Sequence, residues 1–361
     1  MPGSTADGSA GATAPEGFGR AAPDGPRPAH RPSAPDGIVV VDKPGQWTSH
    51  DVVGRMRTLA GTRRVGHAGT LDPMATGVLV IGIGRATRLL GHISGADKSY
   101  AATFRLGWGT VTDDREGERL VDAERGTGAA ELSEAAIRRG IAALTGTLMQ
   151  RPATVSAIKV QGRRSHERVR SGEQVDLPER LVTVSAFDLL DLRRDRDADT
   201  LDLDVQVTCS SGTYIRALAR DLGAALDVGG HLTALRRSRV GVFMLDHAHS
   251  LDELDRAMDV TPMAQAARTA FPSLTVSAPD ANAVRHGRSI ELGMAWARAA
   301  ADDPTATTDL DPGAPAHARV PDRPDRPVPP HALFAPDGDF LALAAPRPDG
   351  TTKYLAVFSQ P

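Results

Sequence analysis

The 361-residue sequence has little cysteine, little lysine, few aromatic side chains and no long apolar run. Its single cysteine, Cys209, excludes a disulfide within the chain and fits a reducing compartment. No apolar run approaches the ~20 residues that a membrane-spanning helix needs. The N-terminus also lacks the charged segment followed by an apolar stretch that marks a secretion signal. We therefore expect a cytoplasmic protein without a membrane anchor.

Lysine is so scarce that nearly every cation is an arginine. The formal net charge of −3 does not by itself indicate a nucleic-acid partner. The planar fork of arginine suits phosphates and base stacking, so local clusters are more informative than the total. The densest cluster contains Arg163, Arg164, Arg168 and Arg170, and we interpret it as a phosphate-binding segment.

Composition divides the chain into three parts. Residues 1–36 are mainly Gly, Ala, Pro, Ser and Asp, which bury too little apolar surface to offset the entropy of ordering, so we expect a disordered tail. Residues 37–268 form the expected main domain. Residues 269–361 form a small β-rich domain, in which the Ala-, Asp- and Pro-rich stretch 299–330 is expected to be a disordered insertion.

Helix-like and strand-like patterns are mixed along the main domain, which predicts an α+β fold. Ser49 is a candidate N-cap for a helix that ends near Gly61. The stretch 98–107 alternates apolar and polar residues, as a half-buried strand does. Two further strands, near 182–186 and 201–207, are expected to be joined by the acidic loop 191–202.

The most informative stretch is the glycine-rich loop from Gly66 to Gly77, with the sequence GHAGTLDPMATG. It carries one carboxylate, Asp72, directly before an apolar run that predicts a buried strand. A carboxylate on a stiff loop is a candidate nucleophile or general base. The alternative is that Asp72 only shapes an Asp-Pro turn, and local chemistry alone favours that alternative.

This loop resembles the signature loop of the TruB family, the bacterial tRNA pseudouridine-55 synthases. The resemblance implies a largely antiparallel central sheet of the pseudouridine synthase type with flanking helices, and a PUA-like C-terminal domain. It implies that Asp72 is catalytic and that uridine 55 in the tRNA T loop is flipped out and isomerised to pseudouridine. It also implies a reaction without a cofactor or metal, and a monomer that binds the T arm of tRNA without an obligate protein partner.

Six further segments carry the resemblance, at Asp42–Asp51, Lys98–Gly107, Thr110–Gly117, Pro152–Arg164, Gly212–Arg216 and His231–Gly241. The resemblance implies that Arg216 pairs with Asp72; a cation at a helix start also needs a nearby carboxylate, because the helix dipole disfavours it there. Tyr100 is expected to stack on the target base. The other residues implied to bind the base or the RNA are Lys43, His67, Arg163, Arg164, Tyr214, Leu235, Arg236 and Arg237.

Other functions remain open at this stage. A related RNA-binding or RNA-folding factor without catalysis would need the same surface. A hydrolase using Asp72 and His67 should show a second activated acid or a metal cluster, and the sequence shows neither. A guide-dependent relative acting on ribosomal RNA is a further alternative. The path of the reaction is also open, since Asp72 could attack the ribose C1′, attack the uracil C6, or direct a deprotonation.

Overall fold

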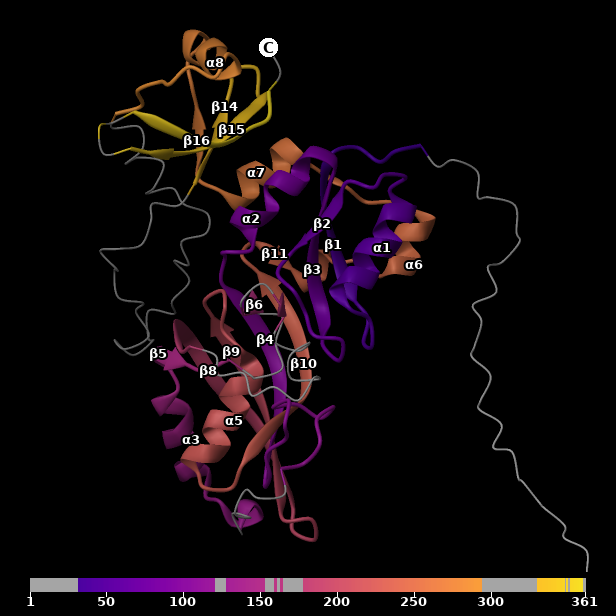
Figure 1. The fold of residues 1–361 in the computed structure, drawn as a ribbon, viewed down its shortest axis with the longest axis vertical. Coiled ribbons are helices and arrows are strands. Elements are labelled where there is room, and N and C mark those ends of the chain that lie inside the picture. Colours follow the sequence, from indigo (N-terminus) through magenta and orange to yellow (C-terminus); the bar gives the residue numbers. More distant parts are fainter. Residues whose placement is uncertain are drawn as a thin grey trace, which may run out of the picture. The chain divides into compact units, whose positions relative to one another are not determined.

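The structure, a computed structural model, describes residues 32–120, 128–152, 178–293, 330–347, 349 and 351–359, and the backbone of 159–160 and 163–164. Two sheets with packed helices account for most of this part, which confirms the α+β prediction (Figure 1). Over the described ranges, no helix is long and apolar enough to cross a membrane.

The larger sheet contains ten of the described strands and is mostly antiparallel. A short parallel pairing joins β10 to β3. Along the sheet the order is β12 (Thr261–Pro262), β1 (Gly37–Lys43), β3 (Thr76–Ile83), β10 (Gly230–Val240), β4 (Lys98–Leu106), β9 (Thr200–Cys209), β8 (Arg180–Asp195) and β5 (Gly146–Gln150); β2 (Val65–Ala68) pairs with β3, and β11 (Phe243–Met244) with β10.

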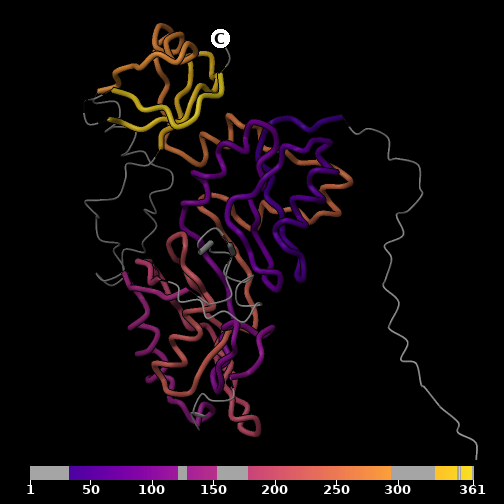
Figure 2. The backbone as a smooth tube through the Cα atoms, viewed as in Figure 1, coloured from indigo at the N-terminus to yellow at the C-terminus, as the bar shows by residue number. Residues whose placement is uncertain are grey.

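One half of this sheet, around β1 and β3, is covered on both faces. Val78 and Val80 pack on one side, and Leu79 and Ile81 pack on the other. This explains why β3 is an almost continuous apolar run. The covering helices are α1 (Ser49–Leu59), η1 (Gly84–Arg88), α2 (Leu90–Ile93), η3 (Leu245–His247), α6 (Leu251–Arg256) and α7 (Met263–Ala270). The early and late segments of the domain therefore lie together in this half, as the indigo and orange tubes show (Figure 2).

The other half, around β4, β9 and β8, is covered by helices on one face. Phe104 and Leu106 of β4 pack into a core with Leu218 and Leu222 of α5 (Ile215–Ala225), and η2 (Ala129–Glu131) and α3 (Glu134–Ala143) lie on the same side. The opposite face is polar. There Arg105 binds Asp202 through two hydrogen bonds of 2.7 Å each. The alternation of β4 is thus as predicted.

Two local predictions were wrong in detail. The N-cap of α1 is Thr48, whose hydroxyl accepts from the Asp51 N–H in a capping box, and Ser49 is the first helical residue. The loop expected at 191–202 is much shorter, because β8 extends to Asp195 and β9 begins at Thr200. Arginines on adjacent positions neutralise the acids there, as in the ion pair of Arg193 with Asp204, so the acidic stretch continues as paired strand.

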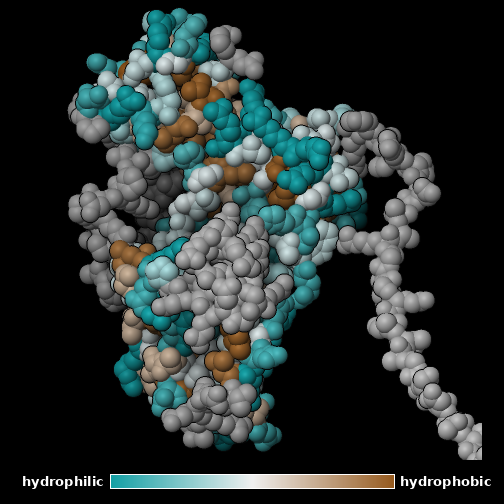
Figure 3. Space-filling view, viewed as in Figure 1, coloured by the Kyte–Doolittle hydropathy of each residue, from teal (hydrophilic) through white to brown (hydrophobic). Residues whose placement is uncertain are grey.

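The C-terminal sheet is small and β-rich, as expected. It consists of β13 (Ser273–Thr275), β14 (His331–Phe334), β15 (Phe340–Pro346) and β16 (Thr352–Val357), with α8 (Ala278–Arg285) against it. A separate short hairpin pairs β6 (Lys159–Val160) with β7 (Arg163–Arg164). On the face drawn in Figure 3, apolar side chains form small separate areas between polar ones, which is normal for a protein surface.

Residues 32–36, which the sequence assigns to the tail, belong to the folded part. The Ser33 hydroxyl donates to the carbonyl of Gly61 at 3.1 Å, and Asp36 forms an ion pair with Arg85. Residues 1–31 of the expected tail and 299–329 of the expected insertion lie outside the described residues.

The parallel contact between β3 and β10 generates a testable prediction at Gly77. Its φ is +99°, and a Cβ there would lie 2.2 Å from the Arg237 carbonyl oxygen. We expect Gly77→Ala to lower the free energy of unfolding by about 2–4 kcal/mol, from backbone strain plus overpacking. The measurement is chemical denaturation of both proteins.

Gly146→Ala is the matched control, because Gly146 has a φ of +101° and an added Cβ would meet no atom of another segment within 4 Å. It should cost only about 1 kcal/mol, the strain alone. Equal losses in the two variants would contradict the close approach of β3 and β10 at Gly77.

Candidate active site

A cavity of about 320 Å³ opens where the Asp72 loop meets the start of α5 and the strands β4 and β10. The sequence singled out several of the residues that line it, and the structure brings these together from four separate segments. They are Asp72, Tyr100, Tyr214, Arg216, Leu235 and Arg237. The remaining lining residues include Lys98, Thr213 and Ile215.

The loop that carries Asp72 is fixed through its backbone carbonyls. Arg237 donates to the carbonyls of Gly69 and Thr70 at 3.1 and 3.4 Å. The Asp72 carbonyl accepts from the Ala75 N–H at 3.1 Å, and the Pro73 carbonyl accepts from the Lys43 ammonium at 3.1 Å. A loop held in this way has little freedom, so the position of the Asp72 side chain is defined.

Ser49 satisfies the remaining peptide group of the loop. Its buried hydroxyl accepts from the Leu71 N–H at 2.9 Å and donates to the Leu71 carbonyl at 3.1 Å. The sequence analysis gave this serine the wrong role, as an N-cap. Its position one residue further into the helix turns the hydroxyl towards the loop, which sequence spacing alone did not reveal.

Lys43 and Arg237, which the sequence analysis expected to bind RNA, are both buried against main-chain carbonyls, and Arg237 also lines the cavity. Lys43 is fully buried, and its ammonium also donates to the carbonyls of Pro44 and Trp47, at 2.9 and 2.6 Å. Arg237 is 1% exposed and donates a further bond of 2.8 Å to the Val78 carbonyl. Both cations are occupied by main-chain oxygens, so they act as supports of the Asp72 loop.

Arg216 lies buried between two carboxylates. Its Nε lies 3.1 Å from Asp72 Oδ2, and Nη2 donates to Asp72 Oδ1 at 3.3 Å. On the other side Nη1 donates to Asp114 Oδ2 at 3.0 Å and to the Thr112 carbonyl at 2.9 Å. The predicted pairing of Arg216 with Asp72 is thus present, and a buried guanidinium with both sides bound cannot easily change position.

Asp114 is a site residue that the sequence analysis missed. A second ion pair lies beside that of Arg216 with Asp114: Arg220, one turn after Arg216 on α5, pairs with Asp113 at 2.8 Å. Two adjacent aspartates and two arginines four residues apart on a helix are a readable signal of such paired contacts. The sequence alone does not show that the Asp113–Asp114 loop lies against α5, so this signal could not be interpreted without the structure.

Part of the cavity wall is apolar. Tyr100 and Leu235 are buried on neighbouring strands, and Ile215 faces the same space from α5. Burial raises the pKa of Tyr100 to about 12, so its phenol stays neutral in the physiological range. The backbone of Tyr214 is held by Gln150, whose side-chain amide both accepts from its N–H, at 2.8 Å, and donates to its carbonyl, at 3.1 Å.

Lys98 is a further lining residue that the sequence analysis did not single out. Its ammonium donates to the carbonyls of Ser94 and Ala96 at 2.9 and 2.8 Å. Burial lowers the pKa of Lys98 to about 8. The cavity therefore carries a cation whose charge is lost just above physiological pH.

Other expected site residues lie outside the cavity. His67, on β2, packs edge-on to His50 with ring centroids 5.8 Å apart, and burial lowers its pKa. Arg236 pairs with Asp42 at 2.7 Å. The side chains of Arg163 and Arg164 are outside the described part. Among the described residues, no cluster of three or more His, Cys, Asp or Glu side chains could hold a metal.

Comparison with known proteins agrees with this arrangement. Residues 57–215 match the model of the TruB family pseudouridylate synthase N-terminal domain, and residues 216–268 match the tRNA pseudouridylate synthase B C-terminal domain. The chain is 52% identical to tRNA pseudouridine synthase B of Arthrobacter sp. (strain FB24), over 90% of this chain and 96% of that protein. It is 50% identical to the protein of that name from Thermobifida fusca (strain YX), over 90% and 99%.

A solved structure shares the fold. It is a chain of the archaeal box H/ACA sRNP Nop10–Cbf5 complex, with a TM-score of 0.60 and 21% identity over 90% of this chain and 86% of that one. The fold and the family models together define a pseudouridylate synthase, an isomerase. Within that class, the chain belongs to the TruB family.

The position of Arg216 between two carboxylates predicts that lysine cannot replace it. A lysine has one ammonium and cannot bind Asp72 and Asp114 with a planar fork. We expect Arg216→Lys to lower the free energy of unfolding by about 2–4 kcal/mol, because a buried carboxylate loses its partner. We also expect it to abolish uridine isomerisation in an RNA substrate.

Arg220→Lys is the matched control, since Arg220 lies on the same helix and pairs with Asp113 but does not contact Asp72. Its side chain is 30% exposed, so the expected loss is about 1 kcal/mol with activity retained. If both variants lost activity to the same extent, the special role of the Arg216–Asp72 contact would be refuted.

Proposed function

We propose that this protein isomerises uridine to pseudouridine at position 55, in the T loop of tRNA, with Asp72 as the catalytic carboxylate. The observation that carries the proposal is the Asp72–Arg216 ion pair at the wall of a cavity that Tyr100, Ile215 and Leu235 also line. The relatives described above carry the name tRNA pseudouridine synthase B, which supports tRNA as the substrate.

The reaction exchanges one bond to the ribose for another. The bond from C1′ to N1 of the uracil breaks, the base turns, and a bond from C1′ to C5 forms, while C5 loses a proton and N1 gains one. A carboxylate serves this sequence by attacking C1′, by attacking C6, or by taking the proton whose loss allows the glycosidic bond to open. All three routes need the Asp72 carboxylate fixed in place, and the ion pair with Arg216 holds it there.

The target base must leave its stack to reach the cavity, because the chemistry occurs at atoms that a folded loop buries. Tyr100 would stack on the flipped uracil, and Leu235 and Ile215 would contact it from the sides. Apolar contacts accept the base in either orientation, so the uracil can turn after the glycosidic bond has broken. His67, kept neutral by burial, would fill the space that the base leaves in the RNA.

Asp72→Asn tests the assignment most directly. The substitution keeps the size and turn-forming habit of the side chain and removes its charge. We expect the variant to fold, to bind T-arm RNA with broadly unchanged affinity, and to release essentially no label from uracil C5 in a single-turnover assay. Binding should persist because its main source is contacts to phosphates and bases.

Asp188→Asn provides the control, because Asp188 is an exposed carboxylate on β8 and does not line the cavity. It should retain full turnover. Turnover of Asp72→Asn near that of the unaltered protein would end the catalytic assignment of Asp72. An unaltered protein that bound T-arm RNA without turnover would indicate the non-catalytic RNA-binding alternative.

The lowered pKa of Lys98 predicts a pH dependence of RNA binding. Below pH 8 its ammonium adds a positive charge to the cavity, and above pH 8 the charge is lost. The pKa of Cys209 is raised to about 11 and that of Tyr100 to about 12, so neither group titrates in this range. Affinity for T-arm RNA should therefore fall about three- to tenfold between pH 7 and 9.

Filter binding at fixed salt, with Lys98→Met beside the unaltered protein, measures this effect. The variant shares any titration of the RNA itself, so the difference between the two pH profiles reports Lys98. We expect Lys98→Met to bind more weakly at pH 7 and to show a flatter profile. Lys43, whose pKa burial also lowers to about 8, remains in both proteins. If the two pH profiles ran parallel, the charge of Lys98 would not contribute to RNA affinity.

A further inference from the structure

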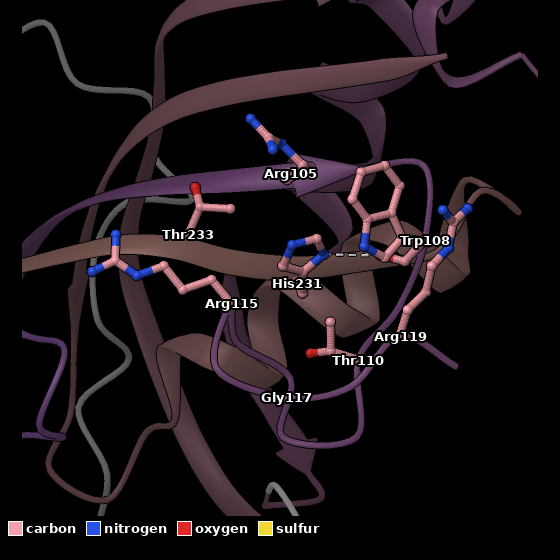
Figure 4. A pocket seen from close by; sticks show the side chains of 8 residues that line it. All are labelled: Arg105, Trp108, Thr110, Arg115, Gly117, Arg119, His231 and Thr233. Atoms are coloured by element: carbon pink, nitrogen blue, oxygen red, sulfur yellow. Dashed lines mark hydrogen bonds between the residues drawn. The ribbon is translucent and has the colours of Figure 1, made fainter. Parts of the chain in front are cut away.

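A second cavity, of about 420 Å³, lies beside β4 and β10, on the face of the sheet opposite to α3 and α5. The alternation of both strands establishes the face: Phe104 and Leu232 point into the core with α5, whereas Arg105 and Thr233 line this cavity. The loop after β4 forms its other wall (Figure 4). The lining residues are Arg105, Trp108, Thr110, Arg115, Gly117, Arg119, His231 and Thr233.

Of the residues that the structure describes, three arginines and no carboxylate line this cavity. Arg105 is neutralised by Asp202. The Arg115 guanidinium, in contrast, makes no hydrogen bond or ion pair with any group of the described ranges, and the Arg119 guanidinium contacts only the Trp108 ring there, at 4.4 Å from its centroid. The two exposed guanidinium groups lie on opposite sides of the Trp108 and His231 rings (Figure 4), and each has hydrogen-bond donors available for an anion.

The cavity also has an aromatic and a polar wall. Trp108 lies between Arg119 and His231, and the two rings are 5.5 Å apart with an interplanar angle of 33° (Figure 4). His231 Nδ1 lies 3.0 Å from the Trp108 carbonyl oxygen, which can only accept, so Nδ1 carries the proton. Burial lowers the pKa of His231, and the neutral ring therefore leaves Nε2 as an acceptor.

The wall is held in place before any ligand binds. The Arg115 backbone N–H donates to the Leu232 carbonyl at 2.9 Å, and Thr110 Oγ1 donates to the Asp114 carbonyl at 2.7 Å. Leu120 closes the loop through an N–H bond of 3.0 Å to the Gly109 carbonyl. A ligand entering this cavity does not have to order the loop, which lowers the cost of binding.

We propose that this cavity binds a nucleotide that spans it, with its phosphate at Arg115 and its base against the Arg119–Trp108 pair. A simple inorganic anion would use the arginines but neither the indole nor the His231 acceptor. A nucleotide uses all of them, since its base stacks on aromatic rings or arginine planes and its ribose and base donate hydrogen bonds. The ligand is either a nucleotide within an RNA chain or a free nucleotide. The proposal does not depend on the catalytic role of Asp72.

Tryptophan fluorescence tests the proposal on the full chain. The sequence has three tryptophans, so replacing Trp47 and Trp296 by phenylalanine leaves Trp108 as the reporter. We expect uridine 5′-monophosphate to change its emission saturably, and uridine and inorganic phosphate to bind about tenfold or more weakly. In the same background, Arg115→Ala/Arg119→Ala should weaken binding of the nucleotide by a similar factor.

Arg138→Ala/Arg139→Ala is the charge-matched control, because it removes two exposed arginines from α3. It should leave nucleotide binding unchanged. No saturable change up to about 10 mM nucleotide, or equal weakening in both double variants, would overturn the proposal. Equal affinities for the nucleotide and inorganic phosphate would overturn the base contact.

Binding measurements with two RNAs identify the source of the nucleotide. Full-length tRNA and an isolated T-arm hairpin are compared for binding to the Arg115→Ala/Arg119→Ala variant and to its control. If the Arg115→Ala/Arg119→Ala variant alone loses affinity for either RNA, and that RNA competes with uridine 5′-monophosphate, the ligand is a nucleotide within RNA. If the loss is confined to full-length tRNA, that nucleotide lies outside the T arm. RNA binding that is equal in the two variants, together with uridine 5′-monophosphate binding that only the Arg115→Ala/Arg119→Ala variant loses, identifies a free nucleotide.

Discussion

The active-site architecture depends on satisfying the main-chain carbonyls of one short loop. From Gly69 to Pro73 every peptide oxygen is bound, two of them by Arg237, one by Ser49, one by the Ala75 N–H and one by Lys43. Buried peptide oxygens without partners would each cost free energy, and an irregular loop cannot satisfy them all internally. Side chains from other elements satisfy most of them instead. The loop can then be both irregular and rigid, and Asp72 projects from it into the cavity.

Burial of the cations follows from the same requirement. A lone buried ammonium or guanidinium is unfavourable, but Lys43 and Arg237 are surrounded by carbonyl dipoles, and Arg216 is bound by two carboxylates. Such contacts add little net stability compared with apolar packing, because desolvation offsets most of the attraction. Their consequence is geometric. Each cation has several partners at fixed directions, so displacing the Asp72 carboxylate would disturb several bonds at once.

Sequence patterns predicted what depends on neighbours along the chain. The alternation of β4 and the glycine at the end of α1 are local, and both agree with the structure. The resemblance added the Asp72–Arg216 pair. The burial of Lys43 and Arg237 could not be predicted, because charged residues are usually exposed, and the carbonyls that hold these two belong largely to distant segments. Asp114 was missed for the same reason, since its partner is supplied by α5.

One sheet gives access to two different surfaces because successive residues of a strand point to opposite faces. On β4, Tyr100 faces the cavity that Asp72 lines, and Arg105 faces the other one. The loop after β4 lies along β10 in the same alternating way: Asp114 reaches Arg216 on one side, and the next residue, Arg115, faces the second cavity. A substitution at one of these positions can therefore change one surface with little effect on the other. A change in the backbone of the loop, in contrast, would reach both, since the same peptide bonds carry Asp114 and Arg115.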